Sequence, residues 1–128
     1  MDPWRLVPFV GMHLGCLGVL WTGISGFAVA LAVLMYLARM FFITAFYHRY
    51  FSHRAFESSR PLRFLFAVLG CTAGQRGPLW WASHHRQHHI HSDTELDPHS
   101  PQTDTFWFSH VLWFLTRDAF SIRWGQIG

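Results

Sequence analysis

The sequence predicts an all-α integral membrane protein, in which a helical hairpin is followed by interfacial or cytoplasmic helices that carry clustered histidines. Two observations predict this class. Of the 128 residues, 51% are hydrophobic and only 13% are charged, whereas soluble domains carry about a quarter charged residues. Ten residues are histidines, and seven of them lie between His84 and His110. We therefore expect residues 1–128 to belong to one membrane domain that binds a metal.

The first two apolar runs are long enough to cross a bilayer. They extend over about residues 6–21 and 27–46, with an uncharged stretch between them. A helix needs about 20 apolar residues to span the hydrocarbon, so we expect spans at about 4–23 and 26–47. A cleavable signal peptide is the alternative for the first run. It is disfavoured because no convincing small-residue cleavage site is present and a second span follows at once.

Arginines set the expected orientation, since the chain contains no lysine. The turn between the spans is uncharged, one arginine precedes the first span, and four follow the second: Arg5, then Arg49, Arg54, Arg60 and Arg63. Positive residues favour the cytoplasmic side. Both ends of the hairpin and the histidine clusters are therefore expected on that side. No long basic run occurs, so no nucleic-acid partner is expected.

Three further helices are expected after the hairpin. Residues from about 60 to 72 form an apolar stretch that is too short to cross a membrane. Pro78 suits the start of a second helix, which we expect to end near His91. After a polar loop, residues of about 104–117 are predicted to form an aromatic amphipathic helix at the membrane surface. The histidine-box region extends over residues 48–101.

The first histidine cluster is an HxxxxH motif formed by His48 and His53. Residues five apart on a regular α-helix point about 140° away from each other. Both side chains therefore face one metal site only if the helix ends or distorts between them.

The second cluster places His85, His88 and His89 at i, i+3 and i+4, which is one helical face. His84, His88 and His91 define another face, and geometry alone does not exclude it. Imidazole suits zinc, copper, iron and nickel. A closed structural zinc site uses four ligands, so the larger set favours a binuclear iron site. A metal transporter is disfavoured because the histidines collect outside the spans rather than along them.

Three segments resemble the membrane fatty acyl desaturases, particularly the acyl-CoA Δ9 type. They are RMFFITAFYHRYFSHRAF, HRQHHIHSDTELDPHSP and FWFSHVLW, at residues 39–56, 85–101 and 106–113. The resemblance implies a di-iron centre that uses dioxygen and two external electrons to introduce a cis double bond into a saturated acyl chain. Residues that match the family's iron ligands are His48, His53, His85, His88 and His89.

The resemblance also implies roles for residues around the ligands. Asp93, Asp97 and His99 are expected to hydrogen-bond the ligand histidines. Capping of the loop is the alternative for Asp93. Trp81 is expected to line the apolar tunnel for the acyl chain, and Arg117 to contact the head group of an acyl-CoA. An acyl-lipid is the alternative substrate. Ser83 and Asp118 occupy positions where animal acyl-CoA members carry basic residues, and fewer positive charges weaken the binding of CoA phosphates. Electrons are expected from a separate protein such as cytochrome b5 or ferredoxin.

The chain also departs from the family pattern because a third histidine box, a further HxxHH, and a second pair of spans are absent. We therefore expect an incomplete desaturase domain that is inactive alone. The alternatives are a histidine-box hydroxylase and a non-catalytic metal-binding or transport protein of the membrane.

Overall fold

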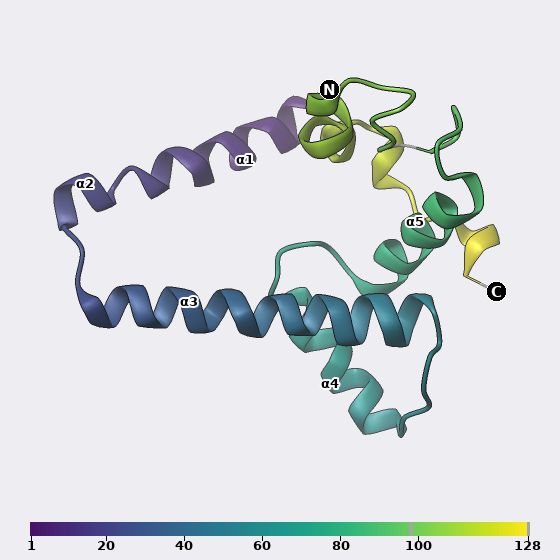
Figure 1. Ribbon diagram of the computed structural model, residues 1–128, viewed down its shortest axis with the longest axis horizontal. Coiled ribbons are helices and arrows are strands. Elements are labelled where there is room, and N and C mark those ends of the chain that lie inside the picture. The colour runs from purple at the N-terminus through teal and green to yellow at the C-terminus, as the bar shows by residue number, and fades with distance from the viewer. Residues whose placement is uncertain (98, 128) are drawn as a thin grey trace.

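A computed structural model describes residues 1–97 and 99–127, and every regular element in that part of the chain is a helix (Figure 1). This confirms the predicted all-α class. The α-helices are α1 (Pro3–Cys16), α2 (Val19–Thr22), α3 (Gly26–Phe41), α4 (Arg60–Cys71) and α5 (Pro78–His91). The described chain also contains two π-helical segments, η1 (Phe42–Ser52) and η2 (Phe108–Leu112). It contains three 3₁₀ turns as well: η3 (Trp113–Leu115), η4 (Asp118–Phe120) and η5 (Trp124–Gln126).

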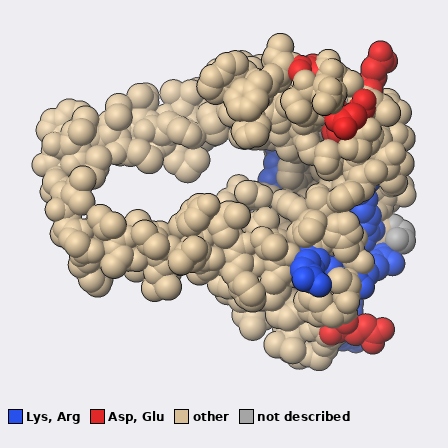
Figure 2. Space-filling view, viewed as in Figure 1, with Lys and Arg blue, Asp and Glu red and all other residues tan. Residues whose placement is uncertain are grey.

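The hairpin consists of two apolar arms that join at the turn beside α2 (Figure 1). One arm is Pro3–Thr22, 20 residues long, and the other is α3 continued by η1, Gly26–Ser52, 27 residues long. Both are long and apolar enough to cross a membrane, and their most apolar stretches are unburied. Figure 2 shows the visible face of the arms near the turn free of charged side chains. These features agree with the predicted membrane hairpin.

Short polar contacts fix where the arms begin. The carboxylate of Asp2 accepts a hydrogen bond from the Trp4 N–H at 3.1 Å, and Pro3 occupies the first helical position. At the start of α3, Ser25 Oγ accepts from the Ala28 N–H at 3.1 Å. Both side chains satisfy amide groups that have no partner within the helix. Gly23 joins the arms with a φ of 73°, a conformation that glycine adopts without a steric penalty.

The second arm extends beyond the expected boundary near residue 47, because the helix continues as η1 to Ser52. Helix α4 packs against η1, with the Phe46 and Phe66 rings stacked at a centroid distance of 4.1 Å. Tyr47 is fully buried at this contact. Its hydroxyl donates to the Arg76 carbonyl at 2.9 Å, so η1, α4 and the turn before α5 form one packed unit.

The region expected to be one amphipathic helix, residues 104–117, is helical over residues 106–115, but it is not one regular α-helix. Its helical turns change from π geometry in η2 to 3₁₀ geometry in η3, and Thr116 is extended. Side chains of this region also contact other elements. Ser109 Oγ donates to the Ser100 carbonyl at 2.8 Å, and Trp113 stacks on Trp80 of α5 with centroids 6.1 Å apart.

Candidate metal centre

The π-helical geometry of η1 brings the two histidines of the HxxxxH motif together. The His53 N–H donates to the His48 carbonyl at 3.1 Å, an i to i+5 hydrogen bond, so residues five apart lie nearly above one another. The Nε2 atoms of His48 and His53 are 3.1 Å apart. The distortion that the motif requires is thus a stretch of π-helix.

Helix α5 adds two more imidazoles to this pair. His85 and His89 lie one turn apart, with their Nε2 atoms 3.0 Å from each other. His85 Nε2 is also 3.1 Å from His53 Nε2. Ligand nitrogens of all four residues, His48, His53, His85 and His89, lie within 4.8 Å of one another. We call these residues the four-histidine group.

The donor chemistry of the four-histidine group fits a transition-metal ion. Four convergent ring nitrogens crowd their lone pairs, and a cation among them satisfies all four at once. Burial, followed by the neighbouring charges of His48, His89 and His53, lowers the pKa of His85 to about 3. Burial and the charges of His53 and His88 also lower the pKa of His89. The rings of His85 and His89 are therefore neutral at pH 7, the form in which imidazole binds a metal.

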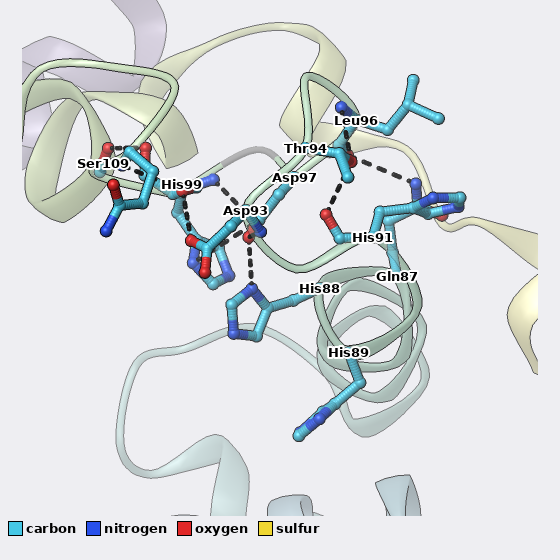
Figure 3. Close-up of polar contacts among 12 residues, drawn as sticks. Gln87, His88, His89, His91, Asp93, Thr94, Leu96, Asp97, His99 and Ser109 are labelled. Carbon is cyan, nitrogen blue, oxygen red and sulfur yellow. Dashed lines mark hydrogen bonds and ion pairs between the residues drawn. The ribbon is translucent and has the colours of Figure 1, made fainter.

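His88 leaves α5 in another direction and forms a second group with Asp97 and His99 (Figure 3). The Nδ1 atom of His88 lies 2.9 Å from Asp97 Oδ2, and that of His99 lies 3.8 Å from Asp97 Oδ1. The two rings are 4.2 Å apart. With Nδ1 engaged by the carboxylate, His88 presents Nε2 as its free ligand atom.

The carboxylate of Asp97 is 1% exposed and accepts two backbone hydrogen bonds besides its histidine contacts. The N–H groups of Asp93 and His99 donate to Oδ2 and Oδ1, each at 3.2 Å. Burial raises the pKa of Asp97, but these hydrogen bonds together with that from His88 outweigh it and hold the pKa below its ordinary value. Asp97 is therefore an anion suited to orient His88.

The side chain of Asp93 forms a hydrogen bond within the loop that follows α5, instead of bonding to a histidine. Its φ is 60°, and its Oδ1 accepts from Ser100 Oγ at 2.7 Å. The loop also contains Pro98, which lies outside the described residues.

Comparison with known proteins decides the family. The model of the family described as fatty acid desaturase matches residues 9–127. This chain belongs to the fatty acid desaturase family.

Several desaturases resemble this family member along most of its length. It is 41% identical over 113 residues to an acyl-CoA 5-desaturase of Anemone leveillei, covering 88% of this chain and 35% of that protein. It is 38% identical over 109 residues to an sn-1 stearoyl-lipid 9-desaturase of Anabaena variabilis, covering 84% and 40%. A Delta-9 acyl-lipid desaturase of Arabidopsis thaliana is 43% identical over 86 residues, covering 67% and 28%.

This chain thus spans well under half the length of these relatives. No solved structure matches it.

Two histidines of α5 stand outside both groups. His84 is 3% exposed, its Nε2 lies 2.9 Å from the Ser121 carbonyl, and its ring packs on Trp80. His91 is half-buried at the end of α5. The alternative face of His84, His88 and His91 is therefore not assembled in the described part of the chain.

The expected substrate residues lie in different surroundings. Trp81 stacks on the His85 ring at 4.7 Å, and its Nε1 donates to Gln75 Oε1 at 3.0 Å. It thus packs directly against the four-histidine group. The side chain of Arg117 is 80% exposed, with Nε 3.9 Å from the Asp2 carboxylate.

Sequence reasoning missed Ser52, whose Oγ donates to the Tyr47 carbonyl five residues earlier at 2.8 Å. A serine inside the HxxxxH motif, able to satisfy a carbonyl released by π geometry, is the signal that identifies it.

Proposed function

We propose that this chain forms part of an oxygen-dependent di-iron fatty acyl desaturase, which introduces a cis double bond at Δ9 of a saturated acyl chain. The observation that carries the proposal is the convergence of four imidazole nitrogens from two separate histidine boxes within 4.8 Å. The overall reaction consumes one dioxygen, two electrons and two protons. It forms one carbon–carbon double bond and two waters.

In this proposal His48, His53, His85 and His89 hold one iron ion, and His88 contributes its Nε2 to the second. Bound iron would supply the oxidising power, drawn from dioxygen, that cleavage of an unactivated methylene C–H bond requires. A single imidazole does not complete a second site, so its remaining ligands must come from other segments. We therefore expect the 128-residue chain alone to be inactive.

The other residues orient and shield these ligands. Asp97 fixes the ring of His88 and makes it a stronger donor, which is the usual effect of a carboxylate on a metal-bound histidine. Asp93 and His99 hold the Asp97 carboxylate through their N–H groups. Trp81 covers one face of the His85 ring and limits the access of water there. An acyl chain held beside this ring would have few orientations open to it.

The substrate is a fatty acyl-CoA or an acyl-lipid, since the named relatives include both kinds. Arg117 is proposed to contact its head group. Electrons come from a separate donor protein, cytochrome b5, ferredoxin or a similar carrier. The four-histidine group lies at the end of the second arm, beside Arg49 and Arg54, so we propose that it faces the cytoplasm.

The proposal is tested with a chimera in which the remaining length is taken from the Anabaena stearoyl-lipid 9-desaturase. Expressed in cells that lack Δ9 unsaturated fatty acids, it should yield Δ9 products measured by gas chromatography and mass spectrometry, and should purify with about two irons per protein. His85→Ala should abolish the product and lower the iron content. The control His110→Ala removes an exposed histidine outside both groups.

Hydroxylated lipid without a new double bond would identify a hydroxylase instead. Metal uptake into vesicles with no lipid product would indicate transport.

A further inference from the structure

Arg86 follows His85 on α5, and its guanidinium group donates three hydrogen bonds to backbone carbonyls. Nε donates to Ser52 at 2.8 Å, Nη2 to Phe51 at 2.9 Å and Nη1 to Gln126 at 2.7 Å. Phe51 and Ser52 end η1, and Gln126 ends η5. A single side chain therefore joins the ends of two other elements to α5.

The end of η1 needs such a partner. The last carbonyls of a helix lack hydrogen-bond donors within the helix, and π geometry seldom persists beyond a single-turn bulge. Here it extends over 11 residues. A positive group at the carboxyl end of a helix is also favoured by the helix dipole. Only an arginine fork supplies several directed N–H groups at once, whereas lysine offers a compact point charge on a flexible stem.

The position of these contacts in the chain links them to the ligands. His53 directly follows Ser52, and Arg86 directly follows His85. We call the three hydrogen bonds of Arg86 the clamp. The clamp thus fixes the distance between the backbones at His53 and His85, whose Nε2 atoms are 3.1 Å apart. We propose that Arg86 is a positioning residue, which holds the end of the π-helix so that His53 completes the four-histidine group. This inference rests on the proposed metal centre.

The first test measures the clamp without metal. In the metal-free protein, Arg86→Lys keeps the charge but loses the fork. Hydrogen–deuterium exchange should accelerate roughly tenfold over residues 49–56, where the His53 and Arg54 N–H groups bond to η1 carbonyls, because local opening becomes easier. Exchange over α4 should stay unchanged, which shows that the fold is intact.

The matched control is Arg49→Lys, since Arg49 is exposed on η1 and its side chain makes no hydrogen bond within residues 1–97 and 99–127. Hydrogen–deuterium exchange over residues 49–56 in Arg49→Lys should be as slow as in the unaltered protein. Unchanged exchange over residues 49–56 in Arg86→Lys would overturn the proposal, whatever the effect of this variant on metal affinity.

The second test asks whether Arg86 acts through His53. Co²⁺ titration, followed by visible absorption, should show that Arg86→Lys binds about tenfold or more weakly, the scale on which residues behind metal ligands act. The double variant with His53→Ala should bind no more weakly than His53→Ala alone. Independent contributions would add, so additive losses would overturn the proposal.

Failure of the unaltered protein to bind Co²⁺ would contradict the metal centre, and with it the purpose of the clamp. The exchange measurement on metal-free protein distinguishes that result from the absence of a clamp.

Discussion

At the scale of single residues, Asp97 organises the second group of side chains. Its two oxygens engage the His88 ring and the N–H groups of Asp93 and His99. Because the carboxylate is buried, each of these contacts is shielded from water and the cost of leaving one unmade is high. The free Nε2 of His88 is therefore aimed by contacts made at the opposite ring nitrogen.

Replacing Asp97 by asparagine should weaken metal binding about 10- to 100-fold, the usual effect of losing a partner behind a ligand. An amide supplies one acceptor oxygen instead of two, and its NH₂ group would face an N–H donor. Isothermal titration with Fe²⁺ under anaerobic conditions measures the affinity. Asp104→Asn is the control, since Asp104 is exposed and belongs to neither histidine group. Equal affinities of the two variants would contradict the orienting role.

At the scale of elements, the contact between η1 and α4 supports the first histidine box. The hydroxyl of Tyr47 donates to the Arg76 carbonyl at 2.9 Å and lies 3.1 Å from Cys71 Sγ, so the ring has a fixed position. Its edge lies directly against Gly70. Since Tyr47 precedes His48, the packing of this ring helps to fix where the box begins.

Gly70→Ala should destabilise the protein, because the added Cβ would lie 2.0 Å from Tyr47 Cε1. Overpacking of this kind costs about 1–3 kcal/mol, and a lower midpoint of thermal unfolding in detergent would report it. Gly11→Ala is the matched control within a helix, since nothing lies within 4 Å of its added Cβ. A midpoint unchanged by Gly70→Ala would show that the ring is free to move.

At the scale of the whole molecule, charge and apolar surface are separated. The arms expose large side chains such as Leu20, Trp21 and Phe27, which are 75–82% exposed. Figure 2 shows charged side chains gathered at the opposite end, around α4, α5 and the C-terminal turns. Exposed apolar surface of this extent is typical of a face that meets lipid or another protein segment.

The orientation in the membrane is tested with single cysteines, after Cys16 and Cys71 have been replaced by serine. A membrane-impermeant maleimide should label Glu57→Cys from the cytoplasmic side and Ile24→Cys from the opposite side, since the arginines follow the second arm. Inside-out and right-side-out vesicles supply the two measurements. Labelling of both cysteines from the same side would rule out a spanning hairpin.

The sequence by itself determined the class of this protein. Composition and the two apolar runs gave an all-α hairpin, because the length and apolarity of a spanning helix are local properties of the chain. The motifs HRYFSH and HRQHH, together with DPH, identified the desaturase family. The i, i+4 spacing of His85 and His89 correctly indicated that these two lie on one face, because helical periodicity is also local.

Only the tertiary structure decided how the histidines are grouped. His88 faces Asp97 instead of the other four, and Arg86 reaches across to η1. The expected helix over residues 104–117 is present over residues 106–115, where it changes to π and 3₁₀ geometry. The contact of Arg86 with the Ser52 carbonyl joins residues 34 positions apart, and His53 and His85, whose Nε2 atoms are 3.1 Å apart, are 32 positions apart. No local pattern in the chain contains that information.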